Sequence, residues 1–224
     1  MKNLAKRKRI RVKFKILCIF YKITNQALRK KIKGKNNIIN TAGAQLKNVQ
    51  INLKGNNNKV ILSPGAIMKN CYLKIKGSNN LIFIDENVRI NLSGTLTCED
   101  NNNQIIIGKK TTIESASLAA IEGTTLKVGM DCMISSSVYI STSDSHSILD
   151  SRTKERVNFA KSIAIGDHVW IGHSSKILKG INIGNNSVVG MGSIVTKNMG
   201  NGVIFAGIPA KLKRSNINWN RKRV

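Results

Sequence analysis

Apolar and polar positions recur in this chain at two fixed spacings, and both spacings indicate β-structure. Four related segments, GKNNII, GNNNKVIL, GSNNLIFI and DNNNQIIIG, begin at Gly34, Gly55, Gly77 and Asp100, so their starts lie 21, 22 and 23 residues apart. Each segment joins a turn rich in glycine or asparagine, where a positive φ costs little, to a short run of strand-forming residues. A constant period of this length predicts a solenoid in which each repeat forms one coil.

Farther along the chain the period shortens to six. An aliphatic residue recurs at Ile165, Ile171, Ile177, Ile183, Val189 and Val195, and small or β-branched residues follow four positions later at Val169, Ser175, Ile181, Ser187 and Ser193. A helix would need a period near 3.6, and each glycine in it would cost about 1 kcal/mol. The pattern instead predicts an all-β, three-faced parallel solenoid with the aliphatic residues stacked inside.

The N-terminal segment has a different pattern. Val12, Ile16, Ile19 and Ile23 fall at helical spacing among lysines and arginines, which predicts a short basic amphipathic helix that caps the open end of the solenoid. We therefore divide the chain into a cap at 1–33, Asn/Gly-rich coils at 34–127, six-residue repeats at 128–214 with an excursion at 146–162, and a basic tail at 215–224.

Composition narrows the classes of partner. The chain has 41% hydrophobic residues, enough for a core, and 37 Lys+Arg against 11 Asp+Glu give a net charge of +26. This charge predicts a polyanionic partner, and by itself leaves membrane surface, nucleic acid and acidic glycan open. Only 4% of residues are aromatic, too few for the stacking platforms that bind single-stranded nucleic acid, so we expect no nucleic-acid partner.

The cysteines and the apolar runs bear on compartment and metal binding. Cys18, Cys71, Cys98 and Cys132 lie too far apart for a zinc motif or a dense disulfide framework, so we expect no metal and a reducing cytoplasm. The apolar run Ile16 to Tyr21 is far shorter than the roughly 18 residues that a membrane span needs. Peripheral contact of the basic N-terminal segment with the inner membrane face stays open.

Residues 163–214 resemble a known family. The string IAIGDHVWIGHSSKILKGINIGNNSVVGMGSIVTKN, followed by VIFAGIPAKLKR, is similar to the hexapeptide-repeat acyltransferases, which include sugar and capsular-polysaccharide O-acetyltransferases. The resemblance is specific from about Val128 and looser through the Asn-rich coils. It implies a left-handed parallel β-helix, a homotrimer, and an acetyl-CoA site in a cleft between neighbouring subunits.

Three histidines are candidates for the base that acyl transfer to a hydroxyl requires. His146 lies where the six-residue rhythm breaks, on the predicted excursion, whereas His168 and His173 lie in regular repeats where a ring can simply face solvent. The resemblance implies that His146 is the general base and that transfer is direct, without an acyl-enzyme. Asp144 is a weaker candidate for orienting its imidazole.

The resemblance also implies cofactor contacts. Coenzyme A requires backbone donors along a groove and a few cations near its phosphates. The positions that match family contacts are His173, Met191, Thr196, Lys197, Lys211 and Arg214. His173 and Met191 depart from the small residues usual there, and Lys211 and Arg214 would read equally as a solvated basic tail.

Acceptor binding has three candidate residues. Related polysaccharide O-acetyltransferases have a tryptophan near the acyl site at the position of Trp170, although a ring on an outward corner also suits a subunit contact. Arg152 and Arg156 lie on the excursion and suit the carboxylate of an acidic sugar such as sialic acid, or form part of a solvated loop.

The leading hypothesis is an acetyl-CoA-dependent O-acetyltransferase of a bacterial-type surface polysaccharide, capsule or lipopolysaccharide, or its precursor. The alternatives are a non-catalytic basic solenoid that binds polyanions and an N-acetyltransferase acting on an amino sugar. The sequence leaves open the acceptor sugar, its hydroxyl and the acyl group.

Overall fold

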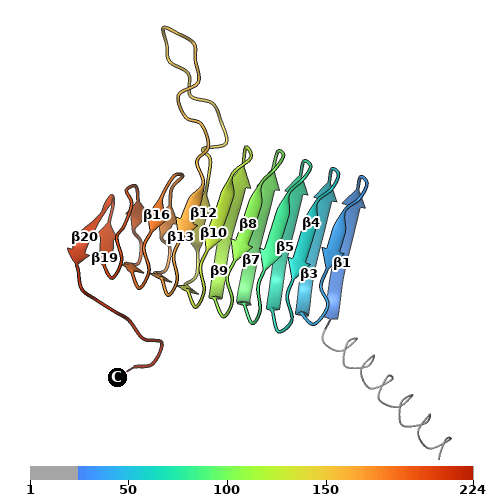
Figure 1. Cartoon of the computed structure of the whole chain (residues 1–224), viewed down its shortest axis with the longest axis horizontal. Helices are drawn as coiled ribbons and strands as arrows, with labels where there is room; N and C mark the ends of the chain where they lie inside the picture. Colours follow the sequence, from blue (N-terminus) through green and yellow to red (C-terminus); the bar gives the residue numbers. More distant parts are fainter. Residues whose placement is uncertain (1–24, 224) are drawn as a thin grey trace, which may run out of the picture.

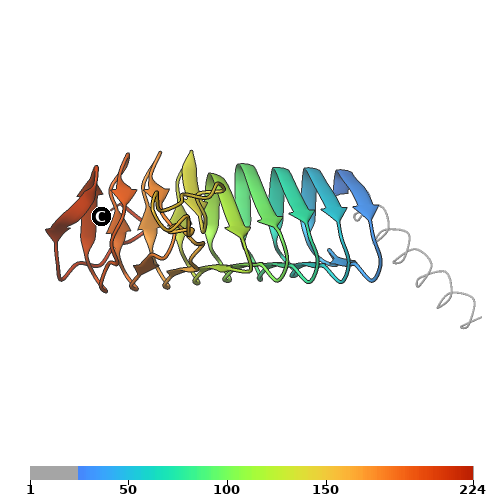
Figure 2. The same ribbon diagram turned by 90° about the horizontal axis from the view of Figure 1, so that it is seen from above.

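The computed structural model describes residues 25–223, which form one left-handed parallel β-helix with three faces (Figures 1 and 2). Strands that span the first and second faces are β1 (Asn25–Lys33), β3 (Gln45–Lys54), β5 (Ile67–Lys76), β7 (Arg89–Glu99) and β9 (Thr112–Ile121). The third face consists of β2 (Ile38–Asn40), β4 (Lys59–Leu62), β6 (Leu81–Ile84), β8 (Gln104–Ile107), β10 (Thr125–Val128), β13 (Ile163–Ile165) and β16 (Asn182–Ile183).

Toward the C-terminus separate short strands replace the long ones. The first face continues through β11 (Met133–Ile134), β14 (Trp170–Ile171), β17 (Val188–Val189) and β19 (Ile204–Gly207), and the second through β12 (Val138–Ser141), β15 (Lys176–Ile177) and β18 (Ile194–Val195). The last strand, β20 (Ala210–Arg214), turns back antiparallel to β19. Pairing each coil with the next satisfies the backbone hydrogen bonds along the solenoid.

Parallel pairing in exact register stacks like residues along the axis. On the third face Val60, Ile82, Ile105, Leu126 and Ile163 are successive partners, and each is at most 1% exposed. Alternate residues of the same strands point to solvent, as the period of two requires. The β-branched and leucine side chains of the repeats therefore form a continuous apolar core, as their spacing predicts.

An asparagine ladder runs inside the corner between the second and third faces. Nδ2 of Asn80 donates to Oδ1 of Asn58 at 3.1 Å, and Nδ2 of Asn103 donates to Oδ1 of Asn80 at 3.0 Å. Asn58, Asn80 and Asn103 are fully or almost fully buried, and each amide also bonds a backbone carbonyl. The ladder continues through Thr124, whose hydroxyl donates to Oγ1 of Thr142 at 2.6 Å.

Positive φ angles explain the choice of asparagine and glycine at the corners. Asn48 and Asn70 have φ of 52° and 50° and bend the long strands from the first face to the second. Gly55 has a φ of 132°, and a Cβ there would lie 1.9 Å from the carbonyl oxygen of Gly77. Only glycine fits that position, because the next coil is already in contact.

The predicted solenoid and its period are confirmed, whereas the N-terminal cap is not. Residues 25–33, assigned to a helical cap, form β1 and pair with β3 over their length, so this part of the prediction is wrong. The reason is register: Leu28 and Ile32 extend the buried columns of Val49 and Leu53, and the helical spacing that predicted the cap ends at Ile23, before this strand begins. The rest of the predicted cap lies outside the described residues. Among residues 25–223 no helix is long and apolar enough to cross a membrane.

Candidate active site

His146 lies on the one long excursion from the described solenoid, between the end of β12 and the start of β13 (Figure 1). The loop leaves from the corner between the second and third faces, and the His146 side chain is exposed. Its backbone is fixed: the N–H donates to the Asp144 carbonyl at 2.8 Å, and its own carbonyl accepts from Nδ2 of Asn158 at 2.8 Å. The backbone of His146 is fixed by hydrogen bonds while its imidazole is open to solvent. This arrangement suits a base that must reach the hydroxyl of a bound acceptor.

A bidentate ion pair anchors the base of this loop. The Arg156 guanidinium donates to both carboxylate oxygens of Glu122 at 2.8 Å, and the Ser143 hydroxyl donates to the same carboxylate at 2.9 Å. Hydrogen bonds from Arg156 and Ser143 lower the pKa of Glu122 below its usual range. Arg156, predicted as an acceptor contact, is thus engaged within the chain and stacks 5.2 Å above the Phe159 ring.

A second anchor engages the Asp144 carboxylate. It accepts from the Lys179 ammonium of a later coil and from Nδ2 of Asn158 at 2.9 Å, and these bonds lower the pKa of Asp144. The structure therefore places Asp144 with Lys179 and Asn158 rather than with the imidazole of His146. Arg152, the other predicted acceptor contact, is exposed near the far end of the loop.

Four of the six predicted cofactor residues, His173, Met191, Thr196 and Lys197, border the C-terminal part of the second face, whereas the other two lie on β20 beside β19 of the first face. His173 and Met191 occupy stacked turns at its edge with the first face, where the His173 carbonyl accepts from the Gly192 N–H at 2.7 Å. Thr196 and Lys197 follow β18 at the opposite edge, in the corner row from which the His146 loop leaves. Lys211 and Arg214 are exposed on β20 at the end of the solenoid. Exposed cations and open turns suit the phosphates and amide arm of coenzyme A.

Trp170 lies on the first face beside the C-terminal tail. The Trp219 ring stacks on His168 with centroids 4.1 Å apart and an interplanar angle of 9°, and its Nε1 donates to the His168 carbonyl at 2.7 Å. Trp170 lies 6.1 Å from Trp219 between centroids. The residues assigned to a basic tail are thus docked on the coils.

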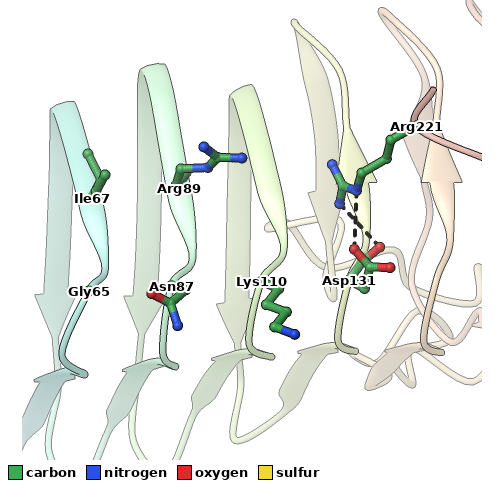
Figure 3. A pocket seen from close by; sticks show the side chains of 7 residues that line it. All are labelled: Gly65, Ile67, Asn87, Arg89, Lys110, Asp131 and Arg221. Carbon is green, nitrogen blue, oxygen red and sulfur yellow. Dashed lines mark hydrogen bonds and ion pairs between the residues drawn. The ribbon is translucent and has the colours of Figure 1, made fainter. Parts of the chain in front are cut away.

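Arg221 extends this docking toward the N-terminal coils. It donates to the Asp131 carboxylate at 3.1 Å, to the Thr112 hydroxyl at 2.8 Å and to the Cys132 carbonyl at 2.8 Å. Figure 3 shows this pair at one end of a hollow of about 400 Å³, with Arg89 and Lys110 along it on earlier coils. The sequence analysis missed this contact, although Trp219, one of only two tryptophans, was a signal against a merely solvated tail.

Within one chain the predicted site residues fall into two groups. The His146 loop leaves from the corner between the second and third faces, whereas Trp170 points outward from the first face. A site that uses both side chains therefore needs two chains.

The described cysteines are not available as nucleophiles. Burial raises the pKa of the Cys71 and Cys98 thiols to about 12 and that of Cys132 to about 11, and all three are free and buried. Over residues 25–223 no group of three or more His, Cys, Asp or Glu side chains is placed to hold a metal ion.

Comparison with known proteins assigns the class. Residues 162–197 match the family model described as the hexapeptide repeat of succinyl-transferase. The chain is 34% identical over 149 residues to the polysialic acid O-acetyltransferase of Neisseria meningitidis. The aligned residues are 66% of this chain and 68% of that protein. This chain belongs to the hexapeptide-repeat acyltransferase family, as the resemblance of residues 163–214 implies.

Two further comparisons concern particular relatives. The crystal structure of the polysialic acid O-acetyltransferase OatWY superposes with a TM-score of 0.82 at 32% identity, covering 87% of this chain and 92% of that one. A polysialic acid O-acetyltransferase of Escherichia coli is 36% identical over 118 residues, which are 53% of this chain and only 38% of that protein. The similarity to OatWY extends over nearly the whole described solenoid, including the Asn-rich coils.

Proposed function

We propose that this protein transfers an acetyl group from acetyl-CoA to a hydroxyl of a surface polysaccharide built from acidic sugars. The observation that carries the proposal is the exposed His146 on a loop anchored at both Glu122 and Lys179, in a chain whose fold matches OatWY. The names of the relatives make polysialic acid the first acceptor to test.

In the proposed mechanism the imidazole of His146 takes the proton of the acceptor hydroxyl. The hydroxyl oxygen attacks the thioester carbonyl, the carbon–sulfur bond breaks, and coenzyme A leaves as the thiolate, which takes up the proton from the imidazolium. A positioned base of this kind contributes about 100- to 10,000-fold in rate. The anchors of the loop hold the imidazole at a fixed place while acceptors exchange.

Acetyl-CoA binding is assigned to the C-terminal coils. The turns of His173 and Met191 offer backbone donors, and Thr196 and Lys197 lie at the other edge of the same face. Lys211 and Arg214, exposed on β20, would contact the phosphates. Arg152 is the exposed cation of the loop for the acceptor carboxylate, and Trp170 would line the acyl site of an adjoining chain.

A homotrimer is part of the proposal, and the third face supports it. Ile61, Phe83 and Ile106 are in-register partners that point outward and are only half-buried in the single chain. A continuous apolar column on a surface favours burial against another copy. Packing of this kind is consistent with His146 of one chain meeting Trp170 of the next.

The site of action is proposed to be the cytoplasm. The predicted contact of residues 1–33 with an anionic membrane falls mostly on residues outside the described range, and it stays a prediction.

Labelled acetyl-CoA tests the function directly. The protein is incubated with it and polysialic acid, and the polymer is isolated and treated with mild alkali. We expect label on the polymer that alkali releases, because an ester is cleaved and an amide is spared. Alkali-stable label would instead assign N-acetylation, and retention of the polymer without label would favour a non-catalytic binding protein.

A further inference from the structure

Lysines stack along the second face in the first coils. Lys33 pairs in register with Lys54, and Lys54 with Lys76, so that three ammonium groups occupy the same position on β1, β3 and β5. Successive parallel strands lie about 4.8 Å apart. We call Lys33, Lys54 and Lys76 the lysine column. Arg29, Lys31 and Lys74 point outward from the same strands beside it.

Glu99 on the same face and Asp100 next to it at the corner are the carboxylates that face this charge. Glu99 is the register partner of Lys76 on β7, and their side chains form an ion pair of 2.8 Å, in which the Lys76 side chain stays 60% exposed. The six cations outnumber these two carboxylates and repel one another at such spacing, since exposed like charges are only partly screened within a Debye length of about 8 Å. A bound polyanion removes that repulsion.

The side chains between the cations suit a sugar rather than a lipid. Asn52 donates to the Tyr72 hydroxyl at 3.2 Å, and Thr95 and Thr97 follow in the same positions on β7. A shallow hollow of about 210 Å³ lies among Arg29, Lys31, Gln50 and Tyr72. Amides, hydroxyls and one ring pair with glycan hydroxyls, whereas a membrane surface would call for exposed apolar anchors.

The lysine column leads to the His146 loop. Glu99, at its end, pairs with Ile121 on β9, and the Ile121 N–H donates to Oγ1 of Thr142 at 3.0 Å, where the loop leaves the solenoid. Four strand spacings, about 19 Å, separate Lys33 from Ile121. Figure 1 shows β1, β3, β5, β7 and β9 in that order toward the loop.

We propose that the lysine column is an acceptor track, along which a linear, carboxylate-bearing glycan lies so that a distant sugar reaches His146. This inference rests on the proposed function, and it adds where and how the polymer is held. Carboxylates of successive sugars contact successive coils, so affinity grows with chain length, as it does for linked binding sites. A short oligomer that reaches only His146 gains nothing from the column.

The test compares two double variants. One removes two charges of the lysine column, and the other removes two lysine charges on the same strands but outside the column. Lys54→Gln/Lys76→Gln alters the column, and Lys47→Gln/Lys69→Gln alters two exposed lysines that pair in register on the first face of β3 and β5. Acetyl transfer is measured with polysialic acid and with a short sialic acid oligomer. Binding of fluorescent polysialic acid is measured by anisotropy without acetyl-CoA, beside neutral dextran and anionic phosphatidylserine vesicles.

We expect the column variant to raise KM and Kd for the polymer about tenfold, with kcat, the oligomer KM and the acetyl-CoA KM changed less than twofold. The control pair should change each constant less than twofold. Equal effects of both pairs, or no effect of the column, would overturn the track even if the polymer is acetylated. Loss of vesicle binding with polymer binding intact would assign the column to a membrane and overturn it too.

Failure of the proposed function gives a different result. If no acetyl transfer occurs with either acceptor, the function fails, while weaker anisotropy binding in the column variant alone still supports the track.

Discussion

The guanidinium of Arg156 and the carboxylate of Glu122 form two parallel hydrogen bonds of 2.8 Å across 34 residues of sequence. The pair joins the returning arm of the His146 loop to the coil that precedes it. A residue that sequence patterns assign to substrate binding is therefore placed to position the loop.

Replacing Arg156 by alanine should loosen the loop. The half-buried Glu122 carboxylate loses its bidentate partner, and we expect the base of the loop to be less stable locally. Limited proteolysis within 146–162 should become faster, and kcat/KM should fall about 10- to 100-fold for acidic and neutral acceptors alike. Arg156→Lys should restore part of both. A rise in KM for acidic acceptors alone, with unchanged proteolysis, would return Arg156 to the acceptor site.

Acidification should release the same anchors. The pKa values of Glu122 and Asp144 are lowered by Arg156 and Lys179, so their contributions are present above the usual carboxyl range and are lost as pH falls through the lowered values. The protection factors of the loop amides, which correct for the pH dependence of intrinsic exchange, should be high and constant from about pH 5 upward and fall below about pH 4, near the ordinary carboxyl range. The Glu122→Gln/Asp144→Asn variant should show fast exchange throughout, and a wild-type loop indifferent to acid would contradict the anchoring.

His146→Ala should abolish transfer and leave the fold intact. The side chain is exposed on the loop, so removal of the base should lower kcat about 100- to 10,000-fold with unchanged melting temperature and acetyl-CoA affinity. Ser151→Ala, on the same loop, is the control and should keep wild-type turnover. A His146→Ala protein with more than a tenth of wild-type activity would show that another group is the base.

Subunit mixing should test the two-chain site. Light scattering at low micromolar concentration should give a trimer. His146→Ala and Trp170→Ala homotrimers should each be nearly inactive, and reassorted mixtures should regain activity, because some interfaces then combine two intact halves. A fully active monomer, or mixtures that stay inactive after proven exchange, would exclude a shared site.

The asparagine ladder should be sensitive to a single truncation. Asn80→Ala leaves the Asn103 backbone N–H and the Asp100 carbonyl without their partners in a buried corner and removes one of the two acceptors of Asn103 Nδ2, which should lower the free energy of unfolding by about 3 kcal/mol. Asn182→Ala, on an exposed strand position, should change it by less than about 0.5 kcal/mol. Urea denaturation measures both, and equal values would show that the ladder adds nothing to stability.

Periodicity made the solenoid predictable, because each coil repeats the same spacing of apolar core residues and turn residues. Ile165, Ile171 and Ile177 occupy buried positions at the predicted spacing, and His146 lies on the predicted excursion. The cap prediction failed over residues 25–33, where pairing with an existing strand decided the structure.

The anchors of the loop were beyond sequence reasoning for a related reason. Glu122 and Lys179 lie in coils before and after the loop, and no period connects them to Arg156 or Asp144. Contacts between single, unrepeated side chains depend on which corner the chain leaves and how it returns. The docking of Trp219 on His168, which are 51 residues apart, is of the same kind.

The in-register asparagine ladder allows the solenoid to change its length by whole coils. Each buried amide contacts the equivalent group of the next coil. A whole coil with its own asparagine, inserted between Asn58 and Asn80, would therefore hydrogen-bond to both and leave neither without a partner. The span between the first coil and the corner at Thr142 would lengthen in steps of about 4.8 Å, one strand spacing at a time. With the acceptor track proposed above, duplication or loss of one repeat in the gene would change the length of polymer that the lysine column can hold, while the loop and everything after it stayed unchanged.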